Sequence, residues 1–302
     1  MGSPNIFIPV NNLLVFPIWW IAATAGLLGL VVGSFLNVVI HRLPRMLERQ
    51  WRLECAASLK TTLLESDITP ASYNLALPAS HCPRCGHVLL ARENIPLLSF
   101  LLQRGRCRSC GEAIPWRYPV IEAITGLSAA FVVWHFGPTT QAFATLCFTG
   151  ILIAASAIDL EHQILPDVLT LPLLWLGLAL SLHGVFVDSS TAIIGAMAGY
   201  LSLWSVYWGF RLLTGKEGMG YGDFKLLAAL GAWMGWRTLP LVLFFSSLVG
   251  AVVGILLIIT RGRSRHQPIP FGPFLAVAGW IVLLWGDDLL NAYLRWSSRL
   301  LL

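Results

Sequence analysis

The stretch TLPLVLFFSSLVGAVVGILLIIT (238–260) contains 23 residues and not one charged side chain. About 20 apolar residues in a helix cross the roughly 30 Å of hydrocarbon in a bilayer. Only a helix satisfies its own backbone hydrogen bonds in hydrocarbon without closing a barrel. The stretch therefore predicts a helix that spans a membrane.

Similar apolar runs recur along the 302-residue chain, of which 56% is hydrophobic and 12% charged. Soluble domains carry about twice that charged share, so we expect an all-α polytopic membrane protein with about eight transmembrane helices. The run 225–236 is short for a crossing. It must be thinly exposed to lipid, tilted against its neighbours, or not a complete span. Besides 238–260, the predicted spans are 16–40, 118–136, 141–159, 168–187, 191–213, 225–236 and 271–290.

The distribution of basic residues predicts the orientation. Seventeen of the 20 Lys and Arg residues lie in segments 41–117, 211–225 and 261–270. Because cytoplasmic loops carry the excess of Lys and Arg, we expect the large first loop in the cytoplasm and both termini in the periplasm. The net charge of +5 then reflects topology and attraction to anionic lipid. We expect membrane lipid as a partner and no nucleic acid.

Three regions are expected along the chain: a first transmembrane segment (1–40), a more polar cytoplasmic module (41–117) and a transmembrane domain (118–302). Within the module, HCPRCG (81–86) and RCRSCG (106–111) each hold a C-x-x-C pair. Paired C-x-x-C motifs are typical of a structural zinc site. Two disulfides are the alternative, but a reducing cytosol disfavours them, and so small a module needs a metal to fold. The predicted ligands are Cys82, Cys85, Cys107 and Cys110.

Two aspartates lie at predicted membrane boundaries. Asp159 ends one span within IDLEHQILPD (158–167), and Asp223 precedes another within GMGYGDFK (218–225). The predicted topology places both at the cytoplasmic side and at similar depth, so they can face each other. Two facing carboxylates share one proton, which is the arrangement of an aspartyl protease. One activates a water, and the other supports the oxyanion that forms.

The glycines before Asp223 fit the same hypothesis. Gly220 and Gly222 lack side chains and permit positive φ, so the backbone can run irregularly and approach an extended peptide closely. A flexible loop in which Asp223 caps the next helix is the simpler alternative. Lys225 is a supporting residue that pairs with a carboxylate or a lipid phosphate, and Asp167 fits a helix cap after Pro166.

Glu122 lies about one turn into the second predicted span. A carboxylate at that depth is a functional candidate, or it snorkels or pairs with an arginine of the loop. A proton-coupled transporter and a zinc-containing scaffold are the other classes considered for the whole chain. Inverted repeats would favour the transporter, and the scaffold leaves both aspartates unexplained.

The sequence resembles bacterial type IV prepilin peptidases, which are bifunctional leader peptidases and N-methyltransferases of pilus and type II secretion systems. The resemblance covers nearly the whole chain. It is carried by GSFLNVVIHRLP (33–44), CPRCG, CRSCG, ENIPLLSFLLQRGRC (93–107), YPVIE (118–122), IDLEHQILPD, GMGYGDFKLLAALGAWMG (218–235) and IPFGPFL (269–275).

The resemblance implies that Asp159 and Asp223 are the catalytic pair of a GxGD-type aspartyl protease in the bacterial inner membrane, and that zinc binds in the methyltransferase part. Such enzymes cut prepilins and pseudopilins after a glycine that ends a basic leader, on the cytoplasmic side. They then methylate the new N-terminal residue with S-adenosylmethionine. Glu93, Gly105 and Glu122 lie in the characteristic stretches and are candidates for binding this cofactor. A peptidase without methyl transfer is the alternative.

Overall fold

A computed structural model describes residues 17–59, 73–261 and 269–300. The regular structure in the described part of the chain is helical, with two isolated β-bridges and turns between the helices, so the predicted all-α class is confirmed. The start of the first predicted span and both chain ends, for which we predict a periplasmic location, fall outside the described residues. The longer helices are α1 (Ile18–Leu59), α3 (Arg117–Phe136), α4 (Thr140–His162), α5 (Asp167–Ser181), α6 (Ser189–Thr214), α7 (Tyr221–Met234), α8 (Leu239–Arg261) and α9 (Gly272–Leu300), and the short ones are η2 (Ala91–Glu93), α2 (Leu98–Leu102) and η3 (Trp236–Thr238).

Among the described residues, five helical segments are long and apolar enough to cross a membrane. They are α1, α3, α4, α6 and the segment Trp236–Thr260, and two shorter apolar helices cover Asp167–Ser181 and Gly272–Gly286. Each predicted span therefore coincides with a helix, although the bounds of the helix and of the predicted span differ. A multi-pass membrane protein follows.

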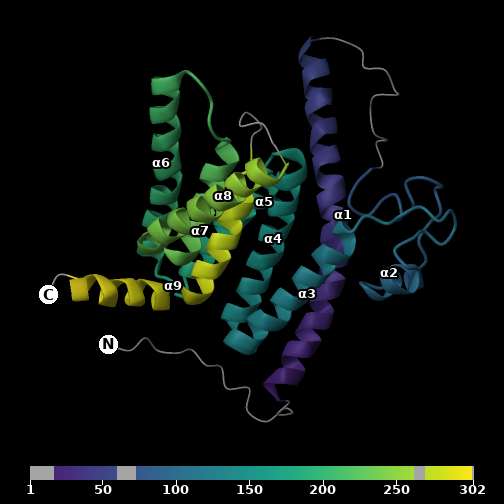
Figure 1. Cartoon of the computed structure of the whole chain (residues 1–302), viewed down its shortest axis with the longest axis horizontal. Coiled ribbons are helices and arrows are strands. Elements are labelled where there is room, and N and C mark those ends of the chain that lie inside the picture. Colours follow the sequence, from purple (N-terminus) through teal and green to yellow (C-terminus); the bar gives the residue numbers. More distant parts are fainter. Residues whose placement is uncertain (1–16, 60–72, 262–268, 301–302) are drawn as a thin grey trace.

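The first helix is longer than a membrane crossing requires. Its 42 residues extend about 63 Å at 1.5 Å per residue, and the helix continues from the first predicted span to Leu59, inside the predicted loop. In Figure 1, α1 projects past the start of α3, with the module that contains α2 on one side and helices α4 to α9 on the other. Buried Arg42 donates to the carbonyl oxygens of Asn74 (2.9 Å) and Pro78 (2.7 Å), and so holds the module to α1.

Helix α7 is enclosed by protein. It has 14 residues, and each one from Leu226 to Met234 is buried, against residues of α4, α5, α6, α8 and α9 in one apolar core. The indole N–H of Trp233 donates to the Leu173 carbonyl of α5 at 2.8 Å. Because neighbours cover it, this helix needs neither the length nor the lipid-facing surface of a separate span, which explains the short apolar run.

Small residues allow the closest helix contacts. On α6, a Cβ at Gly195 would lie 2.2 Å from the Gly231 carbonyl oxygen of α7, and one at Gly199 would lie 2.5 Å from the Leu227 oxygen. Glycines spaced by four residues let two helix backbones approach at such distances. The spacing GAMAG (195–199) is a signal of this contact that the sequence analysis missed.

Candidate active site and metal centre

Asp159 lies in the last turn of α4 and is 5% exposed. The helix ends at His162, where Gln163 adopts the left-handed conformation (φ 57°) and donates its N–H to the Asp159 carbonyl. Pro166, which has no N–H, follows as the N-cap of α5. The chain thus turns immediately after Asp159 and leaves its carboxylate at a helix end.

Asp223 lies in the first turn of α7 and is 7% exposed. Gly220 is the N-cap, with φ of −83°, and neither it nor Gly222 adopts positive φ. Our expectation that these glycines serve through positive φ is therefore wrong. Gly222 is required by close packing instead, because a Cβ there would lie 2.6 Å from the Leu165 Cβ.

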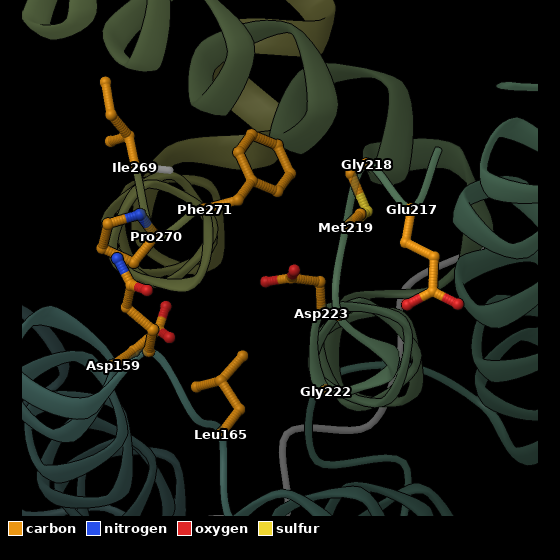
Figure 2. Close-up of a pocket in the computed structure, with 12 residues that line it drawn as sticks. Asp159, Leu165, Glu217, Gly218, Met219, Gly222, Asp223, Ile269, Pro270 and Phe271 are labelled. Carbon is orange, nitrogen blue, oxygen red and sulfur yellow. The ribbon is translucent and has the colours of Figure 1, made fainter. Parts of the chain in front are cut away.

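The two aspartates line one cavity of about 460 Å³. Figure 2 shows them on opposite sides, with the Asp223 carboxylate pointing across the space. Asp159 Oδ2 accepts a hydrogen bond from the Gly272 N–H at 3.1 Å, whereas Asp223 Oδ1 is buried without a partner. The other lining residues are Gln163, Leu165, Glu217, Gly218, Met219, Gly220, Gly222, Ile269, Pro270 and Phe271.

This cavity has the elements that two-carboxylate chemistry requires. Glu217 also lines the cavity, but its carboxylate points away from the space between the aspartates (Figure 2) and lies 3.7 Å from Arg211. No Lys or Arg is among the lining residues. The cavity is large enough for water and part of an extended peptide chain. Leucine, isoleucine and phenylalanine side chains form part of its wall. The sequence analysis named the IPFGPFL stretch without giving it a role, and it did not single out Glu217.

Lys225 does not contact the aspartate pair. Its Nζ bonds to both carboxylate oxygens of Asp167, at 2.6 and 2.7 Å. Lys225 therefore ties the start of α7 to the start of α5, which agrees with the expected carboxylate partner. The expectation that Asp167 caps α5 is wrong, because Pro166 occupies the N-cap and no side-chain cap bond forms there.

The four predicted cysteine ligands meet in one cluster, with all Sγ atoms within 4.8 Å of one another. The Cys82–Cys110 and Cys85–Cys107 sulfur pairs lie 3.8 and 4.0 Å apart. Tetrahedral Zn²⁺ with Zn–S bonds of about 2.3 Å places its sulfurs about 3.8 Å apart, so the cluster fits such an ion. Backbone N–H groups of Cys85 and Arg84 lower the pKa of Cys82, whereas burial and the neighbouring thiols raise the pKa of Cys110, so Cys82 is the thiol of this pair that ionises more readily.

The two C-x-x-C turns have the same construction. In each turn the glycine after the second cysteine, Gly86 or Gly111, has φ near +70° (72° and 73°), and its N–H donates to the carbonyl of the first cysteine. Only a residue without Cβ adopts this conformation readily. Arg84 of the first turn pairs with Glu112 beside the second turn and connects them.

The three candidate cofactor residues each have partners within the chain. Buried Glu93 accepts from His87 Nε2 at 2.9 Å and from the Leu90 N–H at 3.2 Å, and these bonds, led by that of His87, lower the pKa of Glu93 below its ordinary value. Gly105 adopts a φ of +67° in a turn against the Phe100 ring.

Glu122, the third candidate, is buried in α3, and its Oε2 accepts the Leu97 N–H at 2.8 Å. It therefore pairs with neither a loop arginine nor solvent. Glu93 and Gly105 thus have contacts within the cysteine module, and Glu122 joins the module to α3. The predicted role of these residues in cofactor binding stays a prediction.

Comparison with known proteins gives consistent results. Residues 27–136 match the bacterial peptidase A24 N-terminal domain, and residues 146–255 match the type IV leader peptidase family. The chain is 57% identical to a prepilin leader peptidase/N-methyltransferase of Pseudomonas aeruginosa, over 90% of this chain and 93% of the relative. Proteins of the same name from Aeromonas salmonicida (56%, over 91% and 94%) and Stutzerimonas stutzeri (52%, over 96% and 99%) are similarly close. No solved structure matches the chain significantly.

Proposed function

The chain belongs to the type IV leader peptidase family, and from this membership we propose that it is a prepilin leader peptidase and N-methyltransferase. It cleaves the basic leader of type IV prepilins and of type II secretion pseudopilins after a glycine, on the cytoplasmic side of the membrane. It then methylates the newly exposed N-terminal residue with S-adenosylmethionine. The names and high identity of the relatives support both activities.

One observation carries the peptidase assignment: two buried carboxylates from distant parts of the chain line the same cavity. Asp159 and Asp223 are separated by two complete helices in sequence, and both are more than nine-tenths buried within the protein. Burial of a carboxylate without a partner destabilises the folded protein. Two buried carboxylates that line one cavity are therefore best explained by a catalytic role. We assign both residues as catalytic.

The proposed reaction is hydrolysis by water that the aspartate pair activates. Because close like charges cannot both ionise, the pair holds a single proton. The ionised aspartate removes a proton from water as the water oxygen bonds to the peptide carbonyl carbon. The protonated aspartate donates a hydrogen bond to the developing oxyanion. When the C–N bond breaks, a proton passes to the leaving amine.

The position of the cavity suits a substrate that emerges from the bilayer. Its wall is formed by the C-terminal end of α4, the N-terminal end of α7 with the residues before it, and residues 269–271 just before α9. Helix ends lie at the membrane boundary, where the apolar segment of a prepilin meets its leader.

We further propose that the four-cysteine cluster binds Zn²⁺ as a structural ion. Cys82, Cys85, Cys107 and Cys110 supply all four ligands, so no coordination position stays open for chemistry. The ion would connect the two C-x-x-C turns and stabilise a module with little apolar core. S-adenosylmethionine would supply the methyl group, with Glu93, Gly105 and Glu122 as candidate binding residues.

The protein is proposed to lie in the bacterial inner membrane with the first loop and the aspartate cavity in the cytoplasm. The basic-residue distribution supports this orientation. Arg117 at the start of α3 also pairs with Glu161 at the end of α4, at 2.5 Å. This ion pair joins the end of the cysteine module to the helix end that presents Asp159, so the module and the cavity share one face of the membrane domain.

Purified enzyme incubated with a prepilin and labelled S-adenosylmethionine tests both activities. The wild type should release the leader and label the cleaved product. Asp159→Asn and Asp223→Asn should each lose leader cleavage, because the single remaining carboxyl group cannot both remove the proton of water and support the oxyanion, yet each should still label a prepilin peptide that lacks its leader. Methylation of this peptide shows that the variants are folded.

Normal leader cleavage by either variant would reject the catalytic assignment. If the wild type cleaves the prepilin but the product never acquires label, the enzyme is a peptidase without methyl transfer.

A further inference from the structure

The first residue of α9 contacts Asp159, which lines the cavity, and this contact has no role in the function proposed above. Gly272 is the first residue of α9, and its N–H donates to Asp159 Oδ2 at 3.1 Å. Pro273 has no N–H, while the amides of Phe274 and Leu275 both donate to the Phe271 carbonyl. Of the first four residues of this helix, Gly272 alone has an N–H that the helix leaves free, and it is directed at a catalytic carboxylate.

A glycine at this position is required by space. A Cβ on residue 272 would lie 2.6 Å from Asp159 Oδ2 and 3.0 Å from a methyl carbon of Leu165. Both distances are shorter than van der Waals contact. Any side chain at residue 272 would push the Asp159 carboxylate away from the Gly272 amide. The hydrogen bond therefore requires glycine at this position.

The two carboxylates consequently have different environments. Asp159 accepts the one free N–H at the N-terminal end of a 29-residue helix, where this amide and the helix dipole favour negative charge. Asp223 also lies in a first helical turn, but its Oδ1 is buried with no hydrogen-bond partner. A buried oxygen without a donor is better tolerated on a neutral acid than on a carboxylate.

Resting on the proposed peptidase function, we propose that Gly272 is a positioning residue that assigns the roles of the pair. Its N–H holds Asp159 as the ionised member, and Asp223 carries the shared proton. With Oδ2 held by Gly272, the other Asp159 oxygen takes the proton of water as the water oxygen bonds to the carbonyl carbon. Asp223 gives its hydrogen bond to the carbonyl oxygen. The proton on Asp159 passes to the amine nitrogen as the C–N bond breaks, which returns the pair to its starting state.

The experiment measures kcat and KM for leader cleavage in Gly272→Ala and in a matched control. Displacement of one catalytic group by about 1 Å costs on the order of 100-fold in rate, so Gly272→Ala should lower kcat by about that factor while KM changes less than about twofold. Gly150→Ala changes a glycine of the same helix as Asp159 where nothing lies within 4 Å, and it should cleave like the wild type. Methylation of a prepilin peptide without its leader should be normal in both.

Leu165→Ala distinguishes displacement of Asp159 from crowding against Leu165. In Gly272→Ala combined with Leu165→Ala, the added methyl no longer meets Leu165 but still meets Asp159 Oδ2. The double variant also serves if the single variant fails to fold. The double variant should still cleave about 100-fold more slowly than Leu165→Ala alone, since Asp159 stays displaced. Cleavage at the rate of Leu165→Ala, or an unchanged kcat in a folded Gly272→Ala enzyme, would overturn the inference. The peptidase assignment itself fails if Asp159→Asn or Asp223→Asn remains active, whatever the Gly272 variants do.

Discussion

Most of the ionisable residues that the sequence suggested as functional are held by specific partners. Asp159 accepts an amide from α9, Lys225 pairs with Asp167, and Glu122 accepts an amide from the loop before α2. Asp223 differs, because one of its oxygens is buried without a partner. An unsatisfied buried polar atom is destabilising by about 1–3 kcal/mol, and its place beside a cavity agrees with the proposal that a substrate or water bonds to Asp223 there.

The cysteine cluster yields a prediction about individual residues. Metal analysis of the purified protein should find one zinc per chain, and Cys110→Ser should lose it, because one of the four thiolate ligands is removed. Cys55→Ser is the control, since Cys55 lies in α1 and does not belong to the cluster. Wild-type protein without zinc, or a Cys110→Ser variant with full zinc content, would contradict the assignment.

At the scale of the helices, the central feature is that α7 lies inside the bundle. Its N-terminal end presents Asp223 to the cavity, while its C-terminal half is fixed by the indole of Trp233 and by the glycine contacts with α6. A helix surrounded in this way is restricted along its length and in rotation. Asp223 is consequently held at a defined position, which catalysis by a facing pair requires.

The contact of α6 with α7 should be intolerant of even one methyl group. A Cβ at Gly231 would lie 2.1 Å from the Gly195 carbonyl oxygen, so Gly231→Ala must separate the two helices. Overpacking of this kind destabilises proteins by about 1–3 kcal/mol. Thermal unfolding in detergent should show a lower Tm for Gly231→Ala.

The matched control lies on α6. Gly209 has nothing within 4 Å of an added Cβ, and Gly209→Ala should unfold at the wild-type temperature or slightly above it, because alanine favours helix. Equal Tm values for Gly231→Ala and Gly209→Ala would show that the close contact does not constrain the bundle.

For the whole molecule, two independent observations bear on the predicted orientation of the membrane domain. The charge distribution predicts a cytoplasmic first loop, and the Arg117–Glu161 ion pair joins that loop to the end of α4. The cysteine module and the aspartate cavity are therefore adjacent on one side. This arrangement suits an enzyme that performs two successive reactions on the same end of a polypeptide.

Fusions to alkaline phosphatase test this orientation. The enzyme is active only in the periplasm, so a fusion after Gly137, between α3 and α4, should be active. A fusion after Gly215, between α6 and α7, should be inactive at equal expression by immunoblot. The reverse pattern would place the cavity in the periplasm and would contradict cytoplasmic cleavage.

By itself the sequence determined the helical membrane class, the positions of the helices and the cysteine cluster, because these depend on local properties. Hydrophobic length and the spacing of C-x-x-C pairs can be read within short windows. The facing aspartates were a prediction from depth and motif. Only the tertiary structure placed Gly272 on Asp159, 113 residues away in sequence, enclosed α7 and gave Lys225 its partner. These features arise from the packing of helices that are distant in sequence. A local sequence pattern does not indicate which backbone amide or carbonyl this packing brings to a given side chain.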